Sequence, residues 1–485
     1  MKKILFLIIG VIITFFSCKE TNKLNKAENI LKNRIESYIK ECNKNGVSGS
    51  VLVAQNEKVL FSGGFGLSNR NENLQITEET IFTTGSITKQ FTATAILKLQ
   101  EEGKLSVEDS ISKFLVNVPL DKKNITIYQL LTHTSGIKAN LENARDFHPI
   151  EKEEFLRKIF HSSLNFPPGS EHRYSNIGYS ILAIIIEEIT QLDYEEYLQQ
   201  ELFSKAKIKN TGYLLPKWDE TKMAHAYKCQ ENRATHLEKW KSTSNLVSYH
   251  LKGNGGILST PSDLYKWYIA LKKNIIIGEK SFEDLVYPHV LVRKNGKNSY
   301  GYGWVISKSD RNTKKIAHNG FNGVFYAELI RLPEEKHTVI IYMTNQVRYD
   351  TKIIGKELEK LIFDKNYTAV VPKMNSTKYF SGEEPNENME VINEFVSILL
   401  KTETEQTIES FIKTHIPDTG KHKRFKEYFL AMQEEFRNYK LVHTLEYEDD
   451  TYDILLESKK GVIEELTPCF DLKFDEQNQI TAFGW

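Results

Sequence analysis

The sequence predicts an α/β (α+β) protein with two lobes, in which an antiparallel sheet is flanked by helices and a helical lobe is inserted into it. Strand-like segments occur near residue 50 and again between residues 301 and 344, whereas the signals between about residues 80 and 287 are mainly helical. A segment with helices followed by strands lies beyond a polar stretch near residue 380. Strands at both ends of a domain pair in one sheet when the helices between them form a separate lobe, and a site is expected in the cleft between the lobes.

Hydrophobic periodicity locates the elements of the large domain, which we place at residues 27–365. Ala27–Ile39 has helical spacing, and Ser50–Leu60 is typical of two strands around a turn at Gln55–Lys58. Strand character returns at three later segments, which are Gly301–Ile306, Gly323–Leu332 and Thr338–Thr344.

The last part of the chain is expected to form a separate unit. Residues 366–385 are polar and contain Pro and Gly, so we interpret them as a linker. Residues 386–485 are predicted to form a small α+β accessory domain that serves in docking or dimer formation. Its expected helices are Met389–Leu400, Glu405–His415 and Lys421–Arg437, and its expected strands are Tyr439–Tyr447, Thr451–Glu457 and Cys469–Phe474.

The composition excludes several classes of protein. Hydrophobic residues make up 40% of the 485 residues, which is enough to bury sizeable cores and excludes a disordered chain. Lys and Arg together number 64, as do Asp and Glu, so net charge gives no indication of nucleic-acid binding. The four cysteines are too few for a disulfide framework and form no C-x-x-C pair, so neither a metal nor another cofactor is expected.

The first residues predict export. Two lysines precede an apolar run from Ile4 to Phe16, which is too short to span a membrane as a helix and has the length of a secretory signal. Ser17-Cys18 then resembles the lipobox of bacterial lipoproteins. This resemblance implies a signal peptide with its lipobox cysteine at residues 1–18, a lipid on Cys18, and a tether at residues 19–26. An uncleaved anchor, or a signal cut nearby, is the alternative. The expected location is a bacterial membrane surface, periplasmic or outside the cell.

The first candidate catalytic motif is Ser86-Ile87-Thr88-Lys89. Apolar residues from Ile87 to Leu99 have the spacing of an amphipathic helix, so Ser86 lies at a first turn and Lys89 on the same face. A serine is a weak nucleophile that needs a neighbouring base, and a desolvated lysine can serve. Ser-x-x-Lys occurs six times in this chain, so the motif alone is equally typical of capping or surface serines.

Two further motifs occur once each. Tyr174-Ser175-Asn176 follows a Pro-Pro-Gly loop and precedes an apolar helix, and a phenol at such a junction can relay a proton if cations depress its pKa. His318-Asn319-Gly320 precedes a strand, where the glycine allows close backbone approach. The alternatives are a packed tyrosine with a capping asparagine, and an Asn-Gly hairpin turn.

In this order, the three motifs resemble those of the serine β-lactamase and penicillin-binding-protein superfamily, and the chain is most similar to its class C β-lactamase-like branch. The segments LLTHTSG at residues 130–136, GGILST at residues 255–260 and YGYGW at residues 300–304 also match this branch. The resemblance covers about residues 27 to 365 and implies a β-lactamase/transpeptidase-like fold.

The resemblance also implies roles for individual residues. Ser86 would attack a carbonyl to form an acyl-enzyme, and Lys89 and Tyr174 would pass its proton to the leaving group. The backbone N–H groups of Ser86 and Phe321 would bind the oxyanion. Asn176 would hold the substrate amide or the lysine. His318 and Gly320 would belong to the part of the site that binds the substrate.

One position departs from the family pattern. Lactamases and transpeptidases of this superfamily usually have a lysine where this chain has His318, which is mostly neutral near pH 7. This change favours esters or small amides over carboxylate-ended substrates. The sequence therefore predicts a serine hydrolase of the esterase, D-amino-acid peptidase or β-lactamase-like kind that acts on a small molecule or peptide. A non-catalytic penicillin-binding-type sensor and an acyltransferase remain the alternatives.

Overall fold

The computed structural model describes residues 26–142, 146–228, 230–243, 245–380, 387–401, 403–436, 438–447, 451–458 and 469–484. The expected signal peptide at residues 1–18, its Cys18, and residues 19–25 of the expected tether lie outside the described residues. Within the described ranges, no helix is both long and apolar enough to cross a membrane.

The large domain is built on one antiparallel sheet of eight strands in the order β2-β1-β14-β13-β12-β11-β10-β9. The first two strands come from the start of the domain and pair with each other, and β1 also pairs with β14 from its end, as Val51 pairs with Tyr342. The predicted two-lobed fold with an antiparallel sheet and an inserted helical lobe is therefore confirmed. The strands are β1 (Gly49–Gln55), β2 (Lys58–Phe65), β9 (Val290–Leu291), β10 (Ser299–Tyr300), β11 (Val305–Lys308), β12 (Lys314–Phe321), β13 (Tyr326–Leu332) and β14 (Thr338–Thr344).

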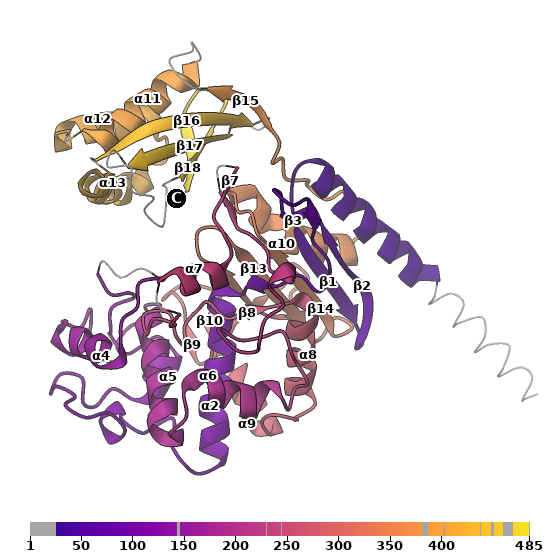
Figure 1. Ribbon diagram of the computed structural model, residues 1–485, viewed down its shortest axis with the longest axis vertical. Coiled ribbons are helices and arrows are strands. Elements are labelled where there is room, and N and C mark those ends of the chain that lie inside the picture. Colours follow the sequence, from indigo (N-terminus) through magenta and orange to yellow (C-terminus); the bar gives the residue numbers. More distant parts are fainter. Residues whose placement is uncertain are drawn as a thin grey trace, which may run out of the picture.

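Helices cover both faces of this sheet (Figure 1). The helix at residues 26–44 and α10 (Ile354–Phe363) pack on one face, where Val51, Ile340 and Leu358 share a core. Helices α2 (Thr88–Glu101) and α8 (Pro261–Lys272) cover the other face. Because successive strand residues point to opposite faces, a strand covered on both sides is buried along its whole length and mainly apolar, as β14 is.

The inserted lobe packs around α2 and α5 (Asn176–Thr190). Ser175 caps α5 by accepting a hydrogen bond from the Gly178 N–H, which sets where the helix starts. The remaining helices are α3 (Ile127–Leu131), α4 (Lys152–His161), α6 (Tyr194–Tyr197), α7 (His236–Thr243) and α9 (Glu279–Leu285). Short strand pairs join β3 (Leu67–Asn69) to β4 (Leu74–Gln75), β5 (Phe82–Thr83) to β8 (Leu258–Ser259), and β6 (Tyr227–Lys228) to β7 (Glu231–Asn232).

The structure differs from expectation at β12, which the sequence did not indicate as a strand. This segment is rich in lysine and contains Asn-Gly, both unfavourable in strands, so its conformation depends on pairing with its neighbours. His318 pairs with Leu329 and Gly320 with Ala327. The His-Asn-Gly motif consequently lies inside a strand, with His318 and Gly320 on its buried side, and forms no hairpin turn.

The C-terminal unit is a five-stranded antiparallel sheet in chain order, with helices packed on one face (Figure 1). Its elements are β15 (Ser376–Phe380), α11 (Glu387–Leu400), α12 (Glu405–His415), α13 (His422–Phe436), β16 (Tyr439–Tyr447), β17 (Thr451–Ser458), β18 (Cys469–Phe474) and β19 (Ile480–Gly484). Strand β15 lies within the segment expected to be a linker and pairs with β16. The expected elements did not include this edge strand because polar residues surround its few β-formers.

Candidate active site

The Ser-x-x-Lys motif spans the junction of a 3-10 turn and the central helix. Ser86 lies in the turn Gly85–Ile87, and Lys89 lies in the first turn of α2, which follows directly. The Lys89 Nζ atom is 3.2 Å from the Ser86 Oγ atom. The expected geometry, a serine at a first turn with a lysine on the same face, is present.

Lys89 is fully buried and has no carboxylate partner among its described hydrogen bonds. Its Nζ donates to the Asn176 Oδ1 atom at 2.8 Å and to the Asn254 backbone oxygen at 2.7 Å. Burial therefore lowers the pKa of Lys89 well below its usual value. A lysine with a depressed pKa gives up its proton more readily than an ordinary lysine, and its neutral form can act as a base.

Tyr174 lies just before α5, with its ring 4.7 Å from the Lys89 Nζ atom. Burial raises the pKa of Tyr174, and a hydrogen bond with Ser86 opposes this shift only in part. Burial thus outweighs any depression of this pKa by nearby cations, the condition named above for a phenol that relays a proton. The phenol therefore stays protonated at neutral pH and is a proton donor.

His318 faces the same cluster of rings but has both ring nitrogens engaged. Its Nδ1 lies 2.6 Å from the Asn319 backbone oxygen, and its Nε2 lies 3.1 Å from the Tyr300 hydroxyl. A carbonyl can only accept, so Nδ1 carries the proton and Nε2 accepts from Tyr300. Burial and the nearby Lys89 lower the pKa of His318 to about 4, so this position offers no cation at neutral pH.

A second histidine shapes the same cluster. The His133 Nδ1 accepts a hydrogen bond from the Ser175 N–H at 3.1 Å, and its ring lies 4.3 Å from that of Tyr174. Burial lowers the pKa of His133 well below its usual value. His133 thus orients the Tyr-Ser-Asn segment as a neutral, structural group.

Strand β12 approaches the nucleophile closely at two glycines. A Cβ atom on Gly320 would lie 1.9 Å from the Thr84 backbone oxygen and 2.7 Å from the Ser86 nitrogen. Gly85 has a φ of +50°, and a Cβ there would lie 2.8 Å from the Phe321 nitrogen. A side chain at either position would clash, so only glycine permits β12 to come this close to the turn that holds Ser86. The backbone nitrogens of Ser86 and Phe321 consequently lie near each other. Two such N–H groups are the usual components of an oxyanion hole.

The cavity beside Ser86 is small and polar, with a volume of about 80 Å³. Asn140, Asp146, Asn176, His236, His250, Asn254, Phe321 and Asn322 are among the residues that line it. The Asn322 side chain donates to the His236 Nε2 atom at 3.0 Å, and burial lowers the pKa of His236 to about 3. The His236 imidazole that lines the cavity is therefore neutral at physiological pH.

The structure brings Ser86, Lys89, Tyr174, Asn176 and Phe321 together, as the motifs predict. Sequence reasoning did not identify the Asn254 carbonyl or the asparagines and histidines of the cavity wall. Asn254 directly precedes the matched Gly-Gly segment, which was the available signal. Across the described part of the chain, no group of three or more His, Cys, Asp or Glu side chains could hold a metal ion.

A family model described as beta-lactamase matches residues 31–360. The chain belongs to the beta-lactamase family. Its relatives in this family include penicillin-binding protein 4* of Bacillus subtilis (strain 168), which is 28% identical over 344 residues, or 67% of this chain and 74% of the relative.

Two solved structures that each cover 70% of this chain share its fold. EstCE1, a hydrolase with promiscuous acyltransferase activity, gives a TM-score of 0.60 at 18% identity and covers 70% of this chain and 100% of its own. A class C beta-lactamase gives a TM-score of 0.58 at 19% identity and covers 70% and 97%. At this level of identity the similarity establishes the fold, and the family is one of serine hydrolases with differing substrates.

Proposed function

We propose that the protein is a serine hydrolase that forms an acyl-enzyme on Ser86 and cleaves small, neutral esters or amides. The observation that carries this proposal is the desolvated Lys89, whose Nζ atom lies 3.2 Å from the Ser86 Oγ atom. A neutral amine has two N–H groups and one lone pair. The N–H groups meet Asn176 and Asn254, so the lone pair is left for the Ser86 hydroxyl.

In this mechanism the Ser86 Oγ atom bonds to the substrate carbonyl carbon while its proton passes to Lys89. The N–H groups of Ser86 and Phe321 stabilise the oxyanion, each contributing on the order of 3 kcal/mol. Tyr174 gives its phenolic proton to the leaving group and regains one from Lys89, so the enzyme is restored. Water then repeats the cycle on the acyl-enzyme, with its proton taken by Lys89.

The preference for neutral substrates rests on the electrostatics of the cavity. Of the described residues that line it, none is a lysine or an arginine, and one is Asp146. His318 is neutral and its acceptor nitrogen is bonded to Tyr300. A substrate carboxylate would lose hydration here without gaining a cation from the described lining residues, which is unfavourable, and the Lys352 ammonium outside the lining already lies 3.9 Å from the centre of the Phe321 ring. The small volume favours a short acyl group.

Intact-mass spectrometry tests the proposal. Wild-type protein, Ser86→Ala and Lys89→Met are each exposed to a fluorophosphonate, a p-nitrophenyl ester and a penicillin. We expect one fluorophosphonate adduct and ester turnover in the wild type, no adduct in Ser86→Ala, and turnover lower by about 10²- to 10⁴-fold in Lys89→Met.

The other outcomes separate the competing functions. A long-lived penicilloyl adduct without ester turnover would identify a sensor or a penicillin-binding peptidase. Formation of a new ester in the presence of an alcohol, in preference to the free acid, would identify an acyltransferase. No adduct with any reagent would exclude a serine nucleophile.

We further propose that the protein is held at a bacterial membrane by a lipid on Cys18. The apolar run followed by Ser17-Cys18 supports this proposal. Metabolic labelling with radioactive palmitate should give a labelled band for the wild type and none for Cys18→Ala. An unlabelled wild type would exclude the anchor.

A further inference from the structure

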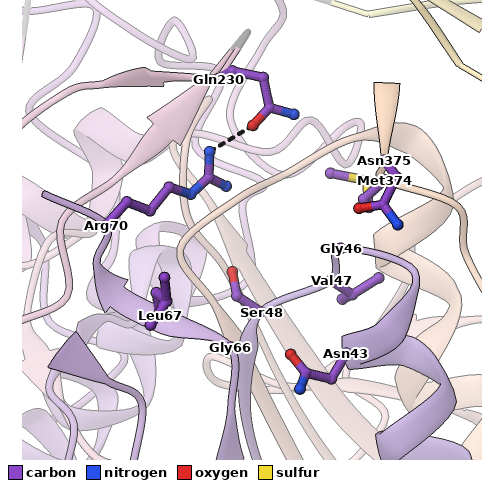
Figure 2. Close-up of a pocket in the computed structure, with 10 residues that line it drawn as sticks. All are labelled: Asn43, Gly46, Val47, Ser48, Gly66, Leu67, Arg70, Gln230, Met374 and Asn375. Atoms are coloured by element: carbon purple, nitrogen blue, oxygen red, sulfur yellow. Dashed lines mark hydrogen bonds between the residues drawn. The ribbon is translucent and has the colours of Figure 1, made fainter. Parts of the chain in front are cut away.

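A second cavity, far larger than the one beside Ser86, lies between the helix at residues 26–44, the start of the sheet and the chain that leads to the C-terminal unit (Figure 2). Its volume is about 520 Å³, within the range of small-molecule sites. None of its ten lining residues lines the cavity beside Ser86. It is therefore a separate site.

Arg70 supplies the charge of this cavity. Its guanidinium faces the open space in Figure 2 and donates to the side-chain oxygens of Gln230, at 2.5 Å, and Gln346. The guanidinium also lies over the Tyr227 ring, 4.0 Å from its centroid. These contacts fix the guanidinium plane and leave three of its five N–H groups without a described partner.

The charge of Arg70 is not balanced inside the described structure. No described carboxylate is among the groups that shift the pKa of Arg70, and both of its side-chain acceptors are neutral amides. The guanidinium is partly buried, and burial lowers its pKa, although an arginine remains charged at neutral pH. An anion in the cavity would offset that cost, because a fixed guanidinium fork matches the planar geometry of a carboxylate.

The opposite wall combines amides with apolar surface. The Asn43 side chain makes no hydrogen bond with a described residue, and Asn375 uses its amide N–H to bind the Lys44 backbone oxygen, which leaves its Oδ1 as an acceptor. Val47 and Met374 lie beside them but are almost fully buried, and the half-buried Leu67 supplies apolar surface to the cavity. Carboxamides pair with peptide groups, and the apolar surface accommodates a small side chain.

We propose that this cavity binds the carboxylate end of a short peptide or N-acyl amino acid, with the carboxylate on Arg70 and the amide groups on Asn43 and Asn375. The site is independent of the acylation site. It lies against the junction of the two units, because Gln230, which contacts Arg70, is also 3.4 Å from the Tyr447 hydroxyl of the C-terminal sheet.

Calorimetric titration of the Ser86→Ala protein with N-acetyl-alanyl-alanine tests the proposal, with the C-terminal amide of the same dipeptide as the matched ligand. The amide cannot form the charge-assisted pair with Arg70. We therefore expect the acid to bind at least about tenfold more tightly than the amide. Arg70→Gln should lose the same factor. Arg293→Gln, which removes an exposed arginine elsewhere, should bind as the parent does.

Two further measurements test the same proposal independently of the Arg70→Gln variant. Asn375→Asp places a negative charge across the cavity from Arg70 and should weaken binding of the acid. Because it keeps Arg70, this variant tests the proposal even if Arg70→Gln does not fold. Wild-type protein blocked by a fluorophosphonate should bind the acid unchanged. Equal binding of acid and amide, or full binding by Arg70→Gln, would overturn the proposal. Binding of inorganic phosphate in place of the dipeptide would overturn the peptide assignment.

Discussion

The Nζ atom of Lys89 lies 2.7 Å from the backbone carbonyl oxygen of Asn254, a residue outside all three motifs. This carbonyl and the Asn176 side chain take both N–H groups of a neutral lysine. The amine cannot rotate its lone pair away from Ser86 without losing one of these bonds. Neutral acceptors thus orient the base and raise its pKa far less than a carboxylate in the same place would.

A carboxylate at residue 176 should therefore shift the pH profile. Lys89 has a pKa well below its usual value, so its basic form persists to lower pH than that of an ordinary lysine and is lost as the pH falls through this depressed pKa. In Asn176→Asp, a negative charge close to Nζ stabilises the ammonium and raises the lysine pKa. We expect the acid limb of kcat/KM for a p-nitrophenyl ester to move up by about one to three pH units, with reduced activity at pH 7.

Asn140→Asp is the matched control for this shift. Asn140 accepts a hydrogen bond from the Asn176 Nδ2 atom at 2.8 Å, but it is exposed, so solvent screens a charge there. Its profile should stay close to that of the wild type. An acid limb at the same pH in Asn176→Asp and the wild type would show that Lys89 is not the titrating base.

The sequence predicted the local parts of this site better than the parts that depend on distant contacts. Ser86 and Lys89 are related by helix geometry, so their proximity follows from spacing alone. The depressed pKa of Lys89 and the raised pKa of Tyr174 depend on burial by segments far away in the chain. Strand β12 has weak strand propensity and is fixed by its neighbours in the sheet, so the pattern did not reveal it.

The close approach of β12 to the nucleophile predicts a severe effect of one methyl group. In Gly320→Ala the added Cβ would overlap the Thr84 backbone oxygen, so the strand must move away from Ser86. The two oxyanion donors would then separate. We expect acylation by a fluorophosphonate to slow by about 10²- to 10³-fold, which single-turnover mass spectrometry measures.

Gly178→Ala is the matched control for this substitution. A Cβ at this position in α5 would make only ordinary contacts, the nearest at 3.6 Å. Alanine also favours helix over glycine by about 0.5–1 kcal/mol. This variant should fold at least as stably and acylate normally. Acylation by Gly320→Ala at the rate of Gly178→Ala would contradict the proposed oxyanion hole.

Substrate charge preference should follow the residue at position 318. His318 has a pKa of about 4, so it contributes no cation above about pH 5. Lowering the pH from 8 to 6 should therefore not improve the turnover of carboxylate-bearing esters. In His318→Lys an ammonium enters this position. We expect kcat/KM for a carboxylate-bearing ester, relative to its neutral analogue, to rise about tenfold, which corresponds to about 1.4 kcal/mol.

His318→Gln controls for loss of the Tyr300 contact. Glutamine is neutral and can still accept a hydrogen bond, so the ratio of the two esters should stay near the wild-type value. An unchanged ratio in His318→Lys would show that this position does not face the substrate carboxylate.

The C-terminal unit is joined to the large domain by an aromatic ring on a buried arginine. The Tyr447 ring lies 3.7 Å from the guanidinium of Arg348, and its hydroxyl donates to the Asp453 Oδ2 atom at 2.7 Å. In Tyr447→Ala the arginine loses this ring and a cavity forms at the junction. We expect the interaction between the units to weaken by about 3–5 kcal/mol, as for other large-to-small aromatic substitutions.

Hydrogen exchange measures this effect where it should occur. Amides of β16 and β17, and those around Gln230 and Arg348, should exchange faster in Tyr447→Ala, while ester turnover at Ser86 stays unchanged because the ring is not part of that site. Tyr447→Phe keeps the ring on Arg348 and loses only hydroxyl hydrogen bonds, so its exchange should rise much less. Faster exchange confined to β16 and β17 would mean that Tyr447 stabilises its own sheet and does not join the two units.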